Sequence, residues 1–478
     1  MLRNLICLLT CSLTLIAYSQ DEIGSFQNSL KTSSSNIKDV IPIVNQETGE
    51  LAMFIADAKN VYGYKLDESF NVQAKLSSAE KRRKYKLLIG SSASANGDYL
   101  VFLSNKNKQK FLCLNFSFDS QKTTEKEFTF QEKKESLLQT VSINNKFYIF
   151  SFHTLKAKVF LYTFDDKGDP SRRELDFSEF KFANNLGKTV GFKTMVAPTS
   201  NKGTLSKFFE NDPQSIESVS VLKKMYIRDG KVIFTFDQNK SYTQVATVDL
   251  NTFELETKQF LKPLSNMPTS GKRTNSYLNG DYIFLSAGTK ERYVLKILDY
   301  ETAAVVNSYS IYKDKPIDFK NTPIIQEGGA YASYRELEKT KKFLRKINQG
   351  KIGISVLKRD SGYELTLGGF KPTGGGGPFF MPGFGLPIAS MGNVTVFFNP
   401  TALAYNSYSA TKSTRIECLF DQDFNHMQGE IQDNAFDIMG DYESPVEKAE
   451  TVFKYLDFYV KGLYDGRTKT YTFRKFTN

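Results

Sequence analysis

Short runs of consecutive apolar residues, each introduced by a polar turn signature, recur along this chain. Asn96-Gly97-Asp98 leads into the apolar run 99–103, and Asn279-Gly280-Asp281 leads into 282–285. Asn-Gly and Asp-Gly pairs favour tight β-hairpins, because the central residues of such turns take positive φ. The pattern therefore predicts a series of hairpins, and further copies begin at Asn144-Asn145-Lys146, Asp229-Gly230-Lys231 and, in looser form, Gly49-Glu50 and Gly328-Gly329.

The hairpin signatures are almost evenly spaced. Neighbouring copies lie 48 to 50 residues apart, except for a longer gap between residues 145 and 230. Two weaker copies follow, at Gly392-Asn393 and near residue 450. A constant spacing of this kind indicates one supersecondary unit repeated many times.

The second predicted strand of each unit is apolar at consecutive positions, as in 147–152. Such a strand needs cover on both faces, which stacked sheets provide and an open sandwich does not. The third predicted strands end on an acidic residue whose carboxylate can accept from the backbone two residues on. These residues are Asp67, Asp165, Asp249, Asp299 and Asp421.

Over residues 39–476 these turn-and-strand units resemble β-propellers in general. The resemblance implies an all-β fold, a single propeller of eight blades, with seven as the alternative, built from short four-stranded antiparallel sheets. Residues 37–478 would then form one domain. Tryptophan-aspartate and kelch repeats normally carry a Trp in each blade and this chain has none, so no specific family and no functional residue is carried over.

The first 19 residues predict a secretory signal peptide. Arg3 precedes the apolar run 5–17, and Ala17-Tyr18-Ser19 places small residues at the cleavage positions. A lipoprotein cleaved before Cys11 is disfavoured, because Thr10 fits that cleavage poorly. No later run reaches 18 apolar residues, so no transmembrane segment is expected after signal removal. We expect export to the periplasm, the outer surface or the medium, with residues 20–36 as a linker or a closing strand.

Cysteine content and charge further limit the classes of protein to which this chain can belong. Only Cys113 and Cys418 follow the signal peptide, in matching contexts of distant units, and both are expected to be buried free thiols. The net charge of +11 is spread along the chain. Without a recognition motif this charge does not predict nucleic-acid binding. If it serves binding, an unknown envelope protein or an acidic glycan is the expected partner, but a solvated surface is the favoured explanation of the charge.

Few residues in the sequence are candidates for catalysis or metal binding. His153 and His426 fall in predicted turns, and neither HExxH nor paired CxxC occurs. Asp421-x-Asp423-x-Asn425 has the spacing closest to a calcium loop, but His426 stands where such a loop needs Gly. An ordinary turn is therefore favoured over a Ca²⁺ site, and no other cofactor is indicated.

The segment 368–387 is rich in Gly, Pro and Phe, a composition unlike that of an inert linker. We expect an insertion in the propeller that either docks a partner or packs its aromatic residues on its own domain. The candidate partner-binding residues are Phe370, Phe379, Phe380, Met381, Phe384 and Leu386.

Two functions are consistent with these patterns. The first is an exported, non-catalytic binding or scaffold protein of the cell envelope. The alternative is a secreted or periplasmic glycan-active hydrolase or lyase that uses carboxylates at the propeller channel. No pair of carboxylates stands out in the sequence, so an enzyme is the less favoured hypothesis and no catalytic residue is predicted.

Overall fold

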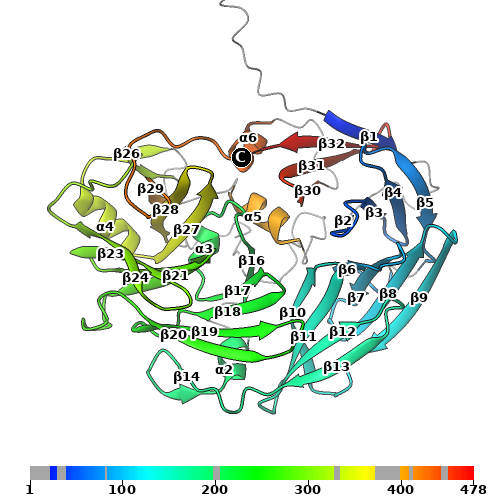
Figure 1. Ribbon diagram of the computed structural model, residues 1–478, viewed down its shortest axis with the longest axis horizontal. Helices are drawn as coiled ribbons and strands as arrows, with labels where there is room; N and C mark the ends of the chain where they lie inside the picture. Colours follow the sequence, from blue (N-terminus) through cyan, green and yellow to red (C-terminus); the bar gives the residue numbers. More distant parts are fainter. Residues whose placement is uncertain are drawn as a thin grey trace, which may run out of the picture.

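The chain folds as a β-propeller, with antiparallel sheets arranged in a ring around a central channel (Figure 1). The computed structural model describes residues 22–28, 39–80, 83–197, 205–327, 334–371, 399–408, 413–442 and 450–477. These residues form five four-stranded sheets, two five-stranded sheets and one two-stranded sheet. The all-β propeller predicted from the sequence is confirmed. Eight blades are not: the described residues contain seven sheets of four or five strands.

We number these seven sheets in chain order. Sheet 1 holds β2 (Asp39–Val44), β3 (Leu51–Ala56), β4 (Val61–Leu66) and β5 (Val72–Ser77). Sheet 2 holds β6 (Leu87–Ala93), β7 (Tyr99–Ser104), β8 (Lys110–Ser117) and β9 (Lys122–Thr129). Sheet 3 holds β10 (Glu135–Ile143), β11 (Lys146–His153), β12 (Val159–Phe164) and β13 (Pro170–Leu175).

The next two sheets continue the ring. Sheet 4 has an extra inner strand, β16 (Ser206–Phe209), parallel to β17 (Lys223–Arg228), followed by β18 (Lys231–Phe236), β19 (Tyr242–Asp249) and β20 (Leu255–Leu261). Sheet 5 holds β21 (Arg273–Asn279), β22 (Tyr282–Gly288), β23 (Arg292–Asp299) and β24 (Val305–Tyr312). The two-stranded sheet, β14 (Phe182–Ala183) with β15 (Thr189–Val190), lies in the long interval between sheets 3 and 4.

The last two sheets depart from simple chain order. Sheet 6 has the order β26 (Arg335–Leu337), β25 (Ile324–Gln326), β29 (Thr414–Phe420), β28 (Gly362–Phe370) and β27 (Lys351–Arg359). Sheet 7 joins both ends of the chain, because β1 (Glu22–Gln27) pairs with β32 (Thr470–Phe476), beside β31 (Phe458–Asp465) and β30 (Thr451–Tyr455). The strand from residues 20–36 thus lies against the C-terminal strand, whereas β2 pairs with β3 in its own sheet.

Five helices accompany the sheets in the part of the chain that the structure describes. They are α2 (Phe192–Val196), α3 (Ile216–Val219), α4 (Thr340–Asn348), α5 (Pro400–Tyr408) and α6 (Ala435–Asp441). Helix α4 was not predicted from the sequence. Its residues Phe343, Leu344 and Ile347 are fully buried on one face, although lysines and an arginine lie between and beside them. None of the described helices is long and apolar enough to cross a membrane.

The turns behave as the sequence predicts. Asn144, Asn145, Asp229 and Gly230 all take positive φ at hairpin tips, between 48° and 70°. Each acid that ends a third strand accepts a hydrogen bond from the backbone two residues on, at 2.8 to 3.1 Å. The donors are the backbone N–H groups of Ser69, Lys167, Asn251, Glu301 and Asp423.

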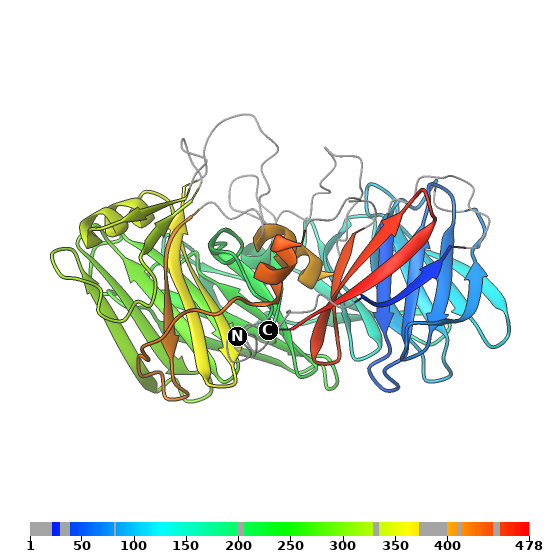
Figure 2. The ribbon, with the colours of Figure 1, turned by 90° about the horizontal axis from the view of Figure 1, so that it is seen from above.

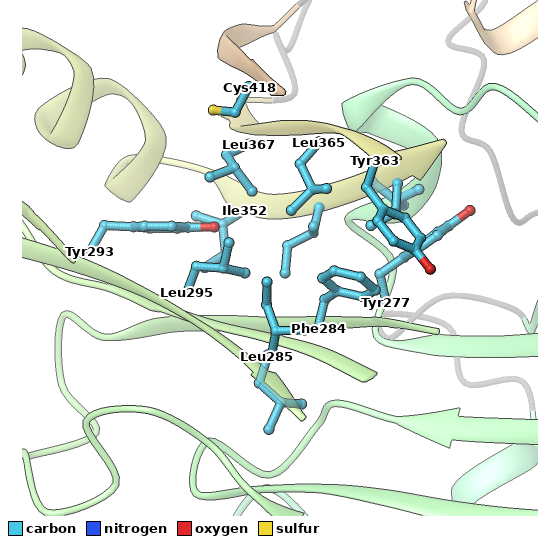
Figure 3. Close-up of a cluster of buried hydrophobic side chains, with 14 of the residues drawn as sticks. Tyr277, Phe284, Leu285, Tyr293, Leu295, Ile352, Tyr363, Leu365, Leu367 and Cys418 are labelled. Atoms are coloured by element: carbon cyan, nitrogen blue, oxygen red, sulfur yellow. The ribbon is translucent and has the colours of Figure 1, made fainter. Parts of the chain in front are cut away.

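The core lies between neighbouring sheets. Every residue of β3 and β7 is buried, which confirms that the second strands are covered on both faces. Figure 3 shows one such interface, where Phe284 and Leu295 of sheet 5 face Ile352, Leu365 and Leu367 of sheet 6. Cys418 belongs to this cluster and Cys113 to the cluster between sheets 2 and 3. Both thiols are free and buried, as predicted, and burial raises the pKa of each.

Candidate functional site

A cavity of about 250 Å³ opens in the central channel. Its walls come from the C-terminal ends of inner strands β2, β6, β10, β16 and β30, and from the start of α5. The hairpin turns found in the sequence follow three of these strands, so they surround this end of the cavity. The lining residues are Pro42, Ile43, Val44, Gln46, Ser91, Ser92, Ala93, Ser142, Ile143, Asn144, Asn145, Lys146, Phe209, Glu210, Asp212, Asn399, Thr401, Phe453 and Lys454.

Helices α3 and α5 occupy the part of the channel beside sheet 6 and part of sheet 7, which leaves the cavity beside sheets 1 to 4 and β30 of sheet 7 (Figure 1). In the view of Figure 2, α5 also lies near the middle of the ring, and α6 packs against α5 and sheet 7. Helix α5 is held by buried polar contacts. Ser407 lies 2.6 Å from Ser215, oxygen to oxygen, and the Asn399 amide donates to the Val452 carbonyl at 2.8 Å. The wall formed by α5 is therefore fixed to helix α3 and to sheet 7.

A side-chain bridge joins two of the turns across the cavity. Asn145 Nδ2 donates to Asn45 Oδ1 at 2.8 Å, and Asn145 Oδ1 accepts from the Gln46 backbone N–H at 2.8 Å. The Asn145 carbonyl also accepts from Ala93 N at 3.1 Å. Because these residues follow or end the inner strands of sheets 1, 2 and 3, the bridge fixes the positions of three sheets relative to one another.

Two carboxylates line the cavity, and both already have partners. Asp212 is buried, and accepts from Thr401 Oγ1 at 2.8 Å and from Tyr459 OH at 3.1 Å. Burial raises the pKa of Asp212 to about 6, against the opposing effect of these hydrogen bonds. Glu210 accepts a hydrogen bond from the Gly280 backbone N–H and lies 3.6 Å from Arg228 Nη1.

The remaining lining combines cationic, hydroxyl and apolar groups. Lys146 and Lys454 are exposed at the rim, and neither makes an ion pair within the described part of the chain. Ser91, Ser92 and Ser142 place hydroxyls on one wall; the apolar surface comes from the strand residues between them and from two phenylalanines. Ligand sites commonly combine a mostly apolar lining with a few convergent polar groups in this way.

The arrangement suits binding better than chemistry. A nucleophile and a general base within hydrogen-bond reach would mark a covalent mechanism, whereas the lining serines have no His or free carboxylate as a described partner. The one ionisable group with a perturbed pKa in the cavity, Asp212, is held by its hydrogen bonds to Thr401 and Tyr459.

Of the predicted partner-binding residues, the structure describes only Phe370, which is not part of the cavity lining. Phe370 is the last residue of β28, where it pairs with Lys351, so the expected insertion begins within a strand. Gly368 and Gly369 are paired residues of that strand, and they are glycines because a Cβ on either would lie within 2.7 Å of neighbouring backbone. The other predicted residues, Phe379, Phe380, Met381, Phe384 and Leu386, lie outside the described residues, as does the signal peptide.

The predicted calcium residues form a turn. Asp421 Oδ1 accepts from the backbone N–H groups of Asp423 and Asn425 at 2.9 and 2.8 Å, and Oδ2 accepts from Asn425 Nδ2 at 3.1 Å. These hydrogen bonds lower the pKa of Asp421. Among the described residues no group of three His, Cys, Asp or Glu side chains could hold a metal ion, and Ca²⁺ at this turn stays a prediction.

The histidines are less exposed than a turn position implies. His153 ends β11 and is buried, and its Nδ1 accepts from Leu155 N at 3.1 Å and Lys156 N at 2.9 Å. The prediction of a surface turn residue is wrong for His153, because its ring forms the acceptor that holds the turn. His426 is half-buried, with Nε2 3.1 Å from Asn321 Oδ1.

No family model matches this chain, and no curated protein matches it. Solved structures match at low similarity. Hsv2 of Kluyveromyces lactis is 9% identical, with 70% of each chain covered and a TM-score of 0.29. The Dos1 propeller is 9% identical, with 95% of this chain and 94% of that chain covered and a TM-score of 0.29. A puromycin hydrolase is 11% identical over 70% of this chain and 42% of its own, with a TM-score of 0.26. Similarity at this level identifies neither a family nor a function.

The cavity residues were not predicted from the sequence. Each contributes through its place at the end of an inner strand, and such positions from five sheets meet only when the ring closes. A usable signal was present, however: the polar residues that follow the first strand of a repeat, such as Asn45, Asn144 and Asn145, lie at the end of the channel where the inner strands finish.

Proposed function

We propose that this protein is an exported, non-catalytic binding protein of the cell envelope, whose ligand occupies the channel cavity. The main support is that five sheets and α5 line one cavity whose polar groups are available to a ligand. The two carboxylates of the cavity already accept hydrogen bonds from other parts of the fold. A propeller channel provides a rigid site, since every wall is a paired strand or an anchored helix. Export rests on the N-terminal signal sequence.

The test is to fill the cavity. Ser92 is a buried lining residue on β6, and Ser92→Phe places a ring in the cavity. Thr124→Phe on the exposed outer strand β9 is the matched control, since it adds the same side chain away from the channel. The mature protein and both variants would be screened by thermal shift against envelope saccharides, peptides and amino acids, because a ligand that binds the folded state raises its melting temperature.

The proposal expects a ligand whose stabilisation is retained by Thr124→Phe and lost by Ser92→Phe. Circular dichroism and an unchanged melting temperature without ligand establish that Ser92→Phe is folded. If the folded Ser92→Phe variant keeps the response to every ligand, the cavity is not the site. Absence of any response in the wild-type protein would equally count against the proposal.

One observation favours a second function, a glycan-active hydrolase or lyase. The pKa of Asp212, raised to about 6, suits a general acid near neutral pH. If the bound saccharide is cleaved by the wild-type protein and Asp212→Asn abolishes cleavage but not binding, the enzyme hypothesis replaces the binding one.

A further inference from the structure

We propose that the cavity binds an acidic saccharide unit, a hexuronic acid, with its carboxylate held by Lys146 and Lys454. This inference rests on the proposed function and adds the ligand class. It follows from the balance of charge in the cavity, from its lining and from its size.

Two lysines that line the cavity form no ion pair among the described residues. Lys146 begins β11 directly after the Asn144-Asn145 turn, and Lys454 lies near the end of β30. They come from two different sheets, 3 and 7, and both line the same cavity. Other exposed lysines are paired, for example Lys126 with Asp169 at 2.6 Å and Lys158 with Glu174 at 2.6 Å. The two rim lysines are thus available to an anion.

The carboxylates of the cavity do not cancel this charge. Arg228 lies beside Glu210, and the Gly280 N–H donates to the same carboxylate oxygen. Asp212 is enclosed by hydroxyl donors and is buried. Both acids therefore have compensating groups within the fold. Lys454 also acts on Asp212 through space and lowers its pKa, but neither rim ammonium group forms an ion pair among the described residues.

The interior fits a hydroxylated body. Ser142 Oγ accepts from Ser91 N at 3.0 Å, which leaves its hydroxyl proton available to a ligand. The amides of Gln46 and Asn144 add donors and acceptors at the rim, where both residues are exposed. Phe209 and Phe453 supply apolar surface for the carbon-bound hydrogens of a sugar ring. A simple inorganic anion would use only the lysines and leave this lining unpaired.

The size of the cavity sets the length of the ligand. At about 250 Å³ it lies just below the usual range of about 300–1,000 Å³ for small-molecule pockets. One sugar unit therefore fills it. The open rim, with exposed lysines, allows that unit to be the end of a longer polysaccharide.

The experiment compares galacturonic acid with galactose, which differ by the carboxylate alone. Isothermal titration calorimetry would be run with wild-type protein, with Lys146→Gln/Lys454→Gln, and with Lys110→Gln/Lys122→Gln. The last variant removes the same charge from exposed positions on β8 and β9. Ser92→Phe reports whether binding occurs in the cavity, and inorganic phosphate serves as the competitor. Tetragalacturonate tests whether the ligand is a free sugar or a chain end.

We expect galacturonic acid to bind wild type and the Lys110/Lys122 control alike, at least tenfold tighter than galactose. The Lys146/Lys454 variant should weaken galacturonic acid about tenfold and leave galactose unchanged, and added salt should weaken the acid more than the neutral sugar.

Three results would overturn the inference. Equal affinities for the acid and the neutral sugar, both lost in Ser92→Phe, would retain the proposed function and exclude the acidic ligand. If phosphate at equal concentration displaces galacturonic acid, the site recognises anions in general and not an acidic saccharide. If neither sugar binds but Ser92→Phe abolishes binding of some other ligand, the acidic saccharide is refuted and the proposed function is retained. Only a cavity that binds no ligand at all would also refute the proposed function.

Discussion

Asp237, between Lys224 and Lys262, should be among the most sensitive polar positions of the fold. All three side chains are fully buried between sheets 4 and 5. Asp237 Oδ1 lies 2.9 Å from Lys262 Nζ and Oδ2 lies 3.0 Å from Lys224 Nζ. Thr243 Oγ1 also donates to Oδ1 at 2.8 Å, and Ser276 Oγ to Oδ2 at 2.8 Å. Burial alone would raise the pKa of Asp237, but the two ammonium groups outweigh it and hold that pKa well below its usual range.

The substitution Asp237→Asn keeps the shape of the side chain and removes its charge. Two ammonium groups would then be buried without a counter-charge, and removal of one partner from a buried ion pair costs about 3–5 kcal/mol. The control is Glu301→Gln, which removes the contact of an exposed carboxylate with Lys258 and should cost less than about 1 kcal/mol.

Urea unfolding followed by circular dichroism and tyrosine fluorescence measures both losses, since the chain has 25 Tyr and no Trp. The triple variant Lys224→Met/Asp237→Leu/Lys262→Met separates charge from packing, because replacing all members of a buried ionic group by apolar residues is often neutral or stabilising. A loss below about 1 kcal/mol for Asp237→Asn, with an unchanged urea slope, would refute the reasoning that this carboxylate compensates the two lysines.

Three further predictions concern single positions. Asp212 has a folded pKa of about 6, above its unfolded value of about 3.9. Its contribution to the free energy of unfolding is therefore complete below pH 4 and is lost as the pH rises through 6. Urea titrations of the wild-type protein should show a loss of about 3 kcal/mol over this window, and titrations of Asp212→Asn should not. In Gly90→Ala the new Cβ would lie 1.9 Å from the Phe147 ring, so the melting temperature should fall by the equivalent of about 1–3 kcal/mol, whereas Gly440→Ala, with no atom within 4 Å, should not destabilise; equal effects would contradict the clash. EDTA should leave the melting temperature unchanged, because the Asp421 carboxylate already accepts the hydrogen bonds of its turn, and a calcium-dependent rise that Asp421→Asn removes would establish a metal site instead.

Local features of the fold could be predicted because they depend on neighbouring residues. The Asn-Gly and Asp-Gly tips, the buried second strands and the acids that end the third strands each follow from backbone conformation or side-chain alternation over a few positions. Helix α4 was missed for a related reason: its apolar residues Phe343, Leu344 and Ile347 stand among five Lys and Arg residues, so charge obscured the helical spacing. His153 was misplaced because its burial depends on the neighbouring strands and not on its own segment.

The sequence by itself determined that this protein is a repetitive all-β ring. Hairpin turns and strands buried on both faces depend on short segments of sequence, and these segments recur about every 50 residues. Only the tertiary structure decided how many large sheets the described residues form, that β1 lies beside β32, and where the cavity lies. Asn45 and Asn145, about 100 residues apart, meet in the channel because ring closure brings together the ends of inner strands. Lys146 and Lys454, over 300 residues apart, reach the same opening for the same reason. A binding site assembled from one or two residues per sheet has no local pattern, and its position depends on closure of the whole ring.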